Sequence, residues 1–219
     1  MDLHNTLITI LVYALPMIFA ITLHEAAHGF VAKHYGDPTA YMLGRVTLNP
    51  MKHIDPIGTI LVPLVTKLIG GFFFGWARPV PVNFNNLREP KRWHTILVAF
   101  AGPFSNMVQV ILWALLAKLL LATVPMTGLV APFWVAVAEA GISVNIMFAL
   151  LNLLPILPLD GGRIVAGLLP PSVSYAYSRT EPYGLFILLA LMFTGALGWM
   201  LGTPFTAAMR GTYALFGFQ

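Results

Sequence analysis

The stretch TLITILVYALPMIFAITL, residues 6–23, carries no charged side chain and continues directly into HEAAH, residues 24–28. A helix needs about 20 mostly apolar residues to cross the roughly 30 Å hydrocarbon core of a bilayer. The stretch has that length, so it predicts a membrane-spanning helix over about residues 6–33 that ends in a group of ionisable side chains. Pro16 is expected to kink this helix.

The composition of the whole chain fits a bilayer rather than water. Of the 219 residues, 58% are hydrophobic and only 9% are charged, which is too few to cover the surface of a soluble domain. The net charge of +4 comes from Lys and Arg beside apolar runs, a pattern typical of cytoplasmic membrane loops. We therefore expect one membrane domain over residues 1–219, surrounded by lipid, with no nucleic-acid partner.

Further apolar runs of spanning length raise the predicted number of transmembrane helices to four. They cover residues 95–124, 132–157 and 183–203. A fifth run, residues 57–75, is interrupted by Pro63, Lys67 and a Gly pair, which disfavour a straight span. Seven of the twelve basic residues flank it on its two sides. The positive-inside rule places both flanks in the cytoplasm, so this run is predicted to be re-entrant.

The same rule predicts the orientation of the chain in the inner cell membrane. The first helix starts outside and ends in the cytoplasm, and the third returns there, so HEAAH and the LDGG motif at residues 159–162 approach the same cytoplasmic face. In ARPVPVN, residues 77–83, two prolines remove alternate main-chain donors, which allows only an edge strand. The predicted fold is thus an all-α integral membrane protein with a re-entrant segment and short β-like edge segments.

His24 and His28 are four residues apart, so on a helix their imidazoles share one face and can hold one zinc ion. The chain has no cysteine, which limits a zinc site to His, carboxylate and water. Glu25 lies beside them, where its carboxylate can act on zinc-bound water as the general base of an HExxH metalloprotease. Ionisable residues inside an apolar span are functional by default, which favours a metal site over a chance match.

Asp160 is the best candidate for a third ligand, because it lies in NLLPILPLDGG at the same membrane face. Pro155 and Pro158 break the helix before it, so that local unwinding can turn the carboxylate inward. An ordinary turn or helix-capping role is the alternative. Asp55 and His53 are rival ligands on a loop, although residues before a proline more often form turns.

Five stretches occur in this order: HEAAH, GRVTLNPMKHIDPIG, GWARPVPVN, AGPFSN and NLLPILPLDGG. Together they resemble the site-2 proteases, in the short prokaryotic form without PDZ or CBS domains. The resemblance implies one zinc ion held by His24, His28 and Asp160, with Glu25 as catalytic acid and base. It also implies cleavage of a peptide bond within or near the single span of a membrane-protein substrate, as in regulated intramembrane proteolysis.

Two asparagines, Asn106 and Asn152, match positions beside the family's catalytic cleft, where they position the scissile peptide or support the oxyanion. Interhelical hydrogen bonding is the alternative for both. Gly102 is expected to allow close helix approach. Two rival functions are disfavoured. A metal transporter would need polar groups that continue outward, but the outer halves of the first and fourth helices offer only weak groups such as Thr6, Thr9 and Thr194, and an inactive scaffold would not need the intact HEAAH and LDGG motifs. Lys118 and Glu139, at matched depths, predict an ion pair.

Overall fold

The computed structural model describes residues 3–61, 78–125 and 127–218. Within these ranges the chain is helical and forms no strand. The elements in order are α1 (Leu3–His34), α2 (Thr39–Met42), η1 (Pro50–Lys52), η2 (Pro56–Leu61), η3 (Phe84–Asn86), α4 (Lys91–Thr123), α5 (Val130–Asn152), α6 (Asp160–Leu168), α7 (Pro171–Ser178), η4 (Glu181–Tyr183), α8 (Gly184–Phe193) and α9 (Ala196–Phe216).

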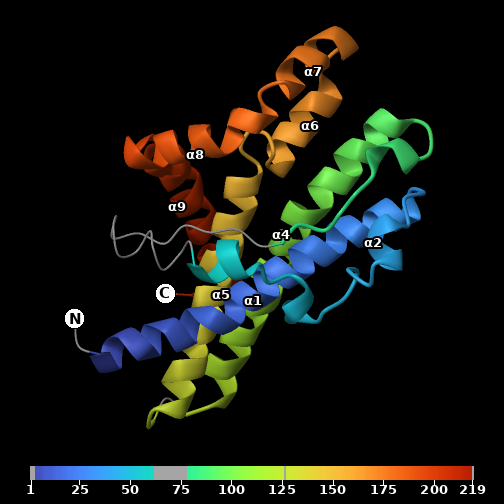
Figure 1. Cartoon of the computed structure of the whole chain (residues 1–219). Helices are drawn as coiled ribbons and strands as arrows, with labels where there is room; N and C mark the ends of the chain where they lie inside the picture. Colours follow the sequence, from blue (N-terminus) through green and yellow to red (C-terminus); the bar gives the residue numbers. More distant parts are fainter. Residues whose placement is uncertain (1–2, 62–77, 126, 219) are drawn as a thin grey trace.

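Three long helices, α1, α4 and α5, pack against one another and form the centre of the molecule (Figure 1). Each is long and apolar enough to cross a membrane. Small side chains lie where the helices meet, and Ala20, Ala114 and Ala138 are fully buried. Within lipid, helix association depends on close backbone approach, which such small residues permit. Three of the four predicted spans are therefore confirmed, and the chain is a multi-pass membrane protein.

The fourth predicted span, over residues 183–203, is not one continuous helix. Helix α8 ends at Phe193 and α9 begins at Ala196, and the two segments are bent by 80° at the break. Gly195 between them has a φ of 76°, a left-handed conformation that glycine adopts without strain. Helix α9 then packs its aromatic side chains against α4 and α5. The apolar run is thus a broken span or a re-entrant pair.

The segments between α1 and α4 differ in part from expectation. Residues 39–42, 50–52, 56–61 and 84–86 form short helical turns, and residues 78–83 form neither helix nor strand. The β-like edge segments are therefore not confirmed in the part of the chain that the structure describes. Of the predicted re-entrant run, residues 62–75 lie outside the described residues.

The predicted ion pair between Lys118 and Glu139 is not formed. The ion pairs among the described residues do not include either side chain. Both side chains are exposed on their helices. Each charged side chain is therefore free of the other and open to the surroundings of the bundle, as long charged side chains near helix ends commonly are.

Asp37 joins the end of α1 to the segment before α4. It is fully buried, and its carboxylate accepts hydrogen bonds from the main chain and hydroxyl of Thr39, the main-chain N–H of Asn83 and the side-chain amide of Asn86. Burial by itself raises the pKa of Asp37, but these hydrogen bonds outweigh it and hold the pKa below its ordinary value of 3.8. The two loops are thereby fixed on one side of the helix bundle.

Asp37→Asn is expected to destabilise the protein at neutral pH. The amide cannot accept all of these hydrogen bonds, so the free energy of unfolding should fall by about 1–3 kcal/mol. Because the folded pKa lies below the unfolded one, the carboxylate's contribution is full well above pH 3.8 and is lost as the pH falls through the folded pKa. Thermal unfolding in detergent from pH 7 to pH 3 measures this. A difference between the two proteins that stays constant over that range would contradict it.

Candidate metal centre

His24 and His28 on α1 meet Asp160, the first residue of α6. The Nε2 atoms of the two imidazoles are 3.1 Å apart. Asp160 places Oδ2 3.2 Å from Nε2 of His24 and Oδ1 3.3 Å from Nε2 of His28. One ligand atom from each of the three residues lies within 4.8 Å of the others. The structure thus brings together the three residues that the sequence selected as candidate ligands.

Asp160 reaches this place through a reversal of the chain after α5. Helix α5 ends at Asn152, and α6 begins at Asp160 rather than continuing the third span. The reversal is tight, since a Cβ atom at Gly161 would lie 2.2 Å from the carbonyl oxygen of Leu153. Only glycine fits there, which explains the pair that follows the aspartate. A carboxylate in the first turn of a helix is also favoured by the helix dipole.

The guanidinium of Arg92, at the start of α4, holds the other end of α6. Its nitrogens donate hydrogen bonds to the main-chain carbonyl oxygens of Gly167, Leu168 and Leu169. The last carbonyl groups of a helix have no partner within the helix, so one guanidinium here satisfies three of them. Helix α6, and with it Asp160, is thereby attached to α4.

Hydrogen bonds orient both imidazoles. Nδ1 of His24 lies 2.7 Å from Oδ1 of Asn106, and Nδ1 of His28 lies 2.7 Å from the carbonyl oxygen of Val98. Carbonyl oxygens only accept, so each Nδ1 carries a proton and the Nε2 atom of each ring is the one that faces Asp160. Such a partner on the far nitrogen is the usual support of a metal-binding histidine.

Asn106 is itself oriented by a second asparagine, which the sequence analysis missed. The side-chain nitrogen of Asn106 donates to the carbonyl oxygen of Ala20 and to Oδ1 of Asn145, whose own nitrogen donates to the carbonyl oxygen of Gly141. Both asparagines are fully buried. The arrangement leaves Oδ1 of Asn106 free to accept from His24. Asn145 could have been recognised from the sequence as a polar amide in the middle of the apolar run 132–157.

These groups fit a metal ion. Two imidazole nitrogens and a carboxylate converge within hydrogen-bonding distance of one another, and in their unprotonated forms these groups repel unless a cation lies among them. Oδ2 of Asp160 is buried without a hydrogen-bond partner among the described residues. Two nitrogens and one carboxylate form the donor set typical of a catalytic zinc site.

Gly102 of α4 leaves room for the two imidazoles. A Cβ atom at this position would lie 2.4 Å from Nε2 of His28 and 2.6 Å from Nε2 of His24. Any larger residue would therefore displace the rings or separate α4 from α1. The close helix approach expected at this glycine is confirmed, and its purpose is to fit the imidazoles between the helices.

Glu25 lies on the same helix but outside the group of three. Its side chain is half-buried, and Oε2 accepts a hydrogen bond of 2.7 Å from the main-chain N–H of Val80. No other hydrogen bond to this carboxylate comes from a residue that the structure describes. Oε1 is therefore available to a water molecule or a substrate.

The remaining candidates lie elsewhere. Asp55 accepts hydrogen bonds from the main-chain N–H groups of Ile57 and Gly58, and Nε2 of His53 contacts the carbonyl oxygen of Thr47. Neither belongs to the metal-binding group found among the described residues. The side chain of Asn152 donates to the carbonyl oxygen of Phe148 in its own helix. Its predicted role beside a substrate stays a prediction.

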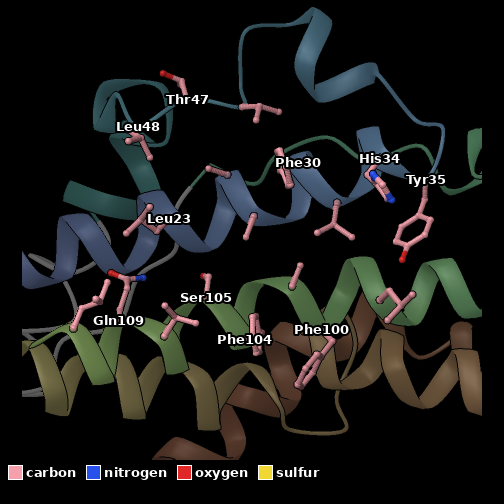
Figure 2. Close-up of a pocket in the computed structure, with 18 residues that line it drawn as sticks. Leu23, Phe30, His34, Tyr35, Thr47, Leu48, Phe100, Phe104, Ser105 and Gln109 are labelled. Carbon is pink, nitrogen blue, oxygen red and sulfur yellow. The ribbon is translucent and has the colours of Figure 1, made fainter. Parts of the chain in front are cut away.

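A groove of about 890 Å³ runs between α1 and α4 next to this centre. Leu23 and Phe30 of α1 face Phe104 and Gln109 of α4 across it (Figure 2). Most of the lining is apolar, although both amide atoms of Gln109 are buried without a hydrogen-bond partner among the described residues. The groove is therefore a mostly apolar cavity with one buried amide in its lining.

Comparison with known proteins identifies the family. The model of peptidase family M50 matches residues 116–195. YwhC of Bacillus subtilis strain 168, which carries a zinc metalloprotease name, is 38% identical over 205 residues, 91% of this chain and 88% of the relative. The chain belongs to peptidase family M50, the site-2 proteases. The resemblance seen in the motifs and the predicted enzyme class, a metallopeptidase, are thereby confirmed.

More distant members of the family carry a similar name. Rip2 of Mycolicibacterium smegmatis is 30% identical over 181 residues, which cover 82% of this chain and 66% of the relative. Rip2 of Mycobacterium tuberculosis strain H37Rv is 28% identical over 189 residues, 86% of this chain and 69% of the relative. Both are named as zinc metalloproteases. No solved structure matches the chain.

Asn145→Leu is expected to weaken metal binding although Asn145 contacts no ligand atom. Without its Oδ1, the amide of Asn106 loses the contact that orients it toward His24, and loss of such outer support typically lowers metal affinity by about 10- to 100-fold. Zinc retention against a graded chelator, measured by mass spectrometry on folded protein, tests this.

Asn152→Leu is the matched control, because it makes the same change on the same helix and removes only a hydrogen bond within α5. It should retain zinc as the unchanged protein does. Equal zinc retention in the two variants would show that the Asn145 amide does not support the site.

Proposed function

We propose that this chain is an intramembrane zinc metalloprotease that hydrolyses a peptide bond within or near the transmembrane segment of a membrane-protein substrate. The observation that carries the proposal is the convergence of His24, His28 and Asp160 between apolar helices, with Glu25 one residue from the first ligand. The zinc metalloprotease names of the relatives support the same metal and reaction.

The proposed reaction begins with an unwound substrate segment, because a helix hides its carbonyl groups in hydrogen bonds. When bound to the two imidazoles and the carboxylate of Asp160, zinc supplies a Lewis acid and lowers the pKa of water toward about 7. Oε1 of Glu25 accepts the proton as water attacks the scissile carbonyl carbon. Glu25 then delivers that proton to the amine nitrogen as the C–N bond breaks, which regenerates its carboxylate.

Glu25→Gln is expected to abolish cleavage and leave zinc in place. Glutamine keeps the size and hydrogen bonding of the side chain but cannot accept the proton, so cleavage should fall by at least about 10²-fold. Asp160→Ala should lose zinc and activity together, because two histidines are an incomplete set for a catalytic site. Metal content and cleavage of a single-span membrane substrate are measured on the same detergent preparations.

Asp55→Ala is the control for the rival ligand and should keep its zinc. An active Glu25→Gln protein would overturn the proteolytic mechanism. Full zinc retention in Asp160→Ala would overturn only the third ligand.

We also propose that the metal centre faces the cytoplasm in the inner cell membrane. Basic residues gather on both flanks of the run 57–75, and the positive-inside rule assigns such flanks to the cytoplasm. They are Lys33, Arg45, Lys52, Arg78, Arg88, Lys91 and Arg92. The hydrogen bonds of Asp37 to Asn83 and Asn86 link the two flanks, which supports their location on one side.

Single cysteines at Lys52 and Arg88 test this orientation. Both positions are exposed, and the chain has no native cysteine, so each variant carries one labelling site. A membrane-impermeant thiol reagent should label both in inside-out vesicles and neither in right-side-out cells. Labelling of the two positions from opposite sides would contradict the proposed topology.

A further inference from the structure

The carboxylate of Glu25 accepts a hydrogen bond from the main chain of the segment Pro79-Val80-Pro81. Pro79 and Pro81 have no N–H group, so Val80 supplies the only main-chain donor of residues 79–81. That N–H lies 2.7 Å from Oε2 of Glu25. A hydrogen bond from a neutral donor to a carboxylate is shorter and stronger than one between neutral groups, and more so where water is scarce.

Arg45 fixes the main chain on the N-terminal side of this donor. Its Nη2 atom donates to the carbonyl oxygen of Arg78 at 2.9 Å and to that of Pro79 at 3.3 Å. The main-chain N–H of Arg78 in turn donates to the carbonyl oxygen of His53. Arg45 is 8% exposed, so its charge is removed from water and committed to these carbonyl groups.

The side chain of Val80 fixes the segment from the other direction. It is buried, and its Cγ1 atom lies against Gly29, where a Cβ atom would approach it to 3.1 Å. Gly29 is one turn beyond Glu25 on α1. Val80 therefore contacts α1 twice, through its side chain at Gly29 and through its N–H group at Glu25. These two contacts determine where the donor lies relative to the carboxylate.

We propose that the main-chain N–H of Val80, held in place by Arg45, positions the carboxylate of Glu25 for proton transfer. The inference rests on the proposed function, in which Glu25 is the base. Fixing Oε2 confines an otherwise flexible side chain to one orientation and leaves Oε1 to meet the attacking water. Neither Val80 nor Arg45 touches the reacting atoms, so both are positioning residues. Displacement of a reacting group by about 1 Å can cost about 10²-fold in rate.

Hydrogen–deuterium exchange tests the contact without reference to activity. The amide of Val80 should exchange slowly in the unchanged protein and in Glu25→Gln, which keeps a side-chain oxygen as acceptor. In Glu25→Ala, which has no acceptor, the Val80 amide should exchange at least about tenfold faster, because an amide without a hydrogen-bond partner needs no local opening to exchange. Equal exchange in all three proteins would overturn the contact.

Val80→Pro removes the donor and keeps an extended, proline-rich segment. We expect kcat to fall by about 10- to 100-fold, with KM within about twofold and zinc content unchanged, because the lost interaction serves the transition state. Val82→Pro is the matched control, since Val82 also follows a proline and its N–H makes no hydrogen bond among the described residues. That control should keep kcat within about twofold.

Arg45 provides a second test if Val80→Pro fails to fold. Arg45→Met keeps the length of the side chain and removes the donors, so kcat should fall with zinc retained, whereas Arg45→Lys keeps a donor and a charge and should restore part of kcat. Equal kcat in these two variants, or in Val80→Pro and Val82→Pro, overturns the inference. An active Glu25→Gln protein overturns the proposed function itself, so the two failures are distinguishable.

Discussion

Two imidazole nitrogens and a carboxylate turn their electron pairs toward one another between apolar helices. Such an arrangement is unfavourable in a medium of low dielectric unless a cation occupies it. The protein does not relieve the repulsion by moving the groups apart, since Asn106 and Val98 hold the imidazoles and the turn before α6 holds Asp160. Much of the surrounding structure consists of contacts that hold His24, His28 and Asp160 close together.

Close packing of α4 against α1 is the first of these contacts. Gly102 lets α4 approach α1 until the imidazoles fill the space between them, and fully buried alanines continue that contact along the bundle. The buried amides of Asn106 and Asn145 then satisfy each other across the three helices. In lipid such polar contacts are satisfied only within the protein, so helix packing and ligand orientation depend on the same few residues.

Much of the site could be predicted from the sequence because its signals are local. The spacing of His24 and His28 on a helix needed no knowledge of the fold, and Asp160 needed only the predicted topology, which brings it to the same membrane face. The role of Asn106 could not be derived in the same way, since its hydrogen bond to His24 joins residues 82 positions apart. Asn145 was overlooked for the same reason. Hydropathy predicted four spans, of which three are continuous helices, but it did not predict the bend at Gly195, because an apolar run indicates burial and not the direction of the chain.

Helix α4 contacts both halves of the metal centre, through Gly102 at the imidazoles and through Arg92 at the end of α6. The helix that contacts the histidines is thus the same helix that holds the end of α6. Pro16 of α1 lies about two turns before His24, so it is separated from the ligands along the helix. A change in the tilt of α4 would therefore act on both halves of the metal centre at once.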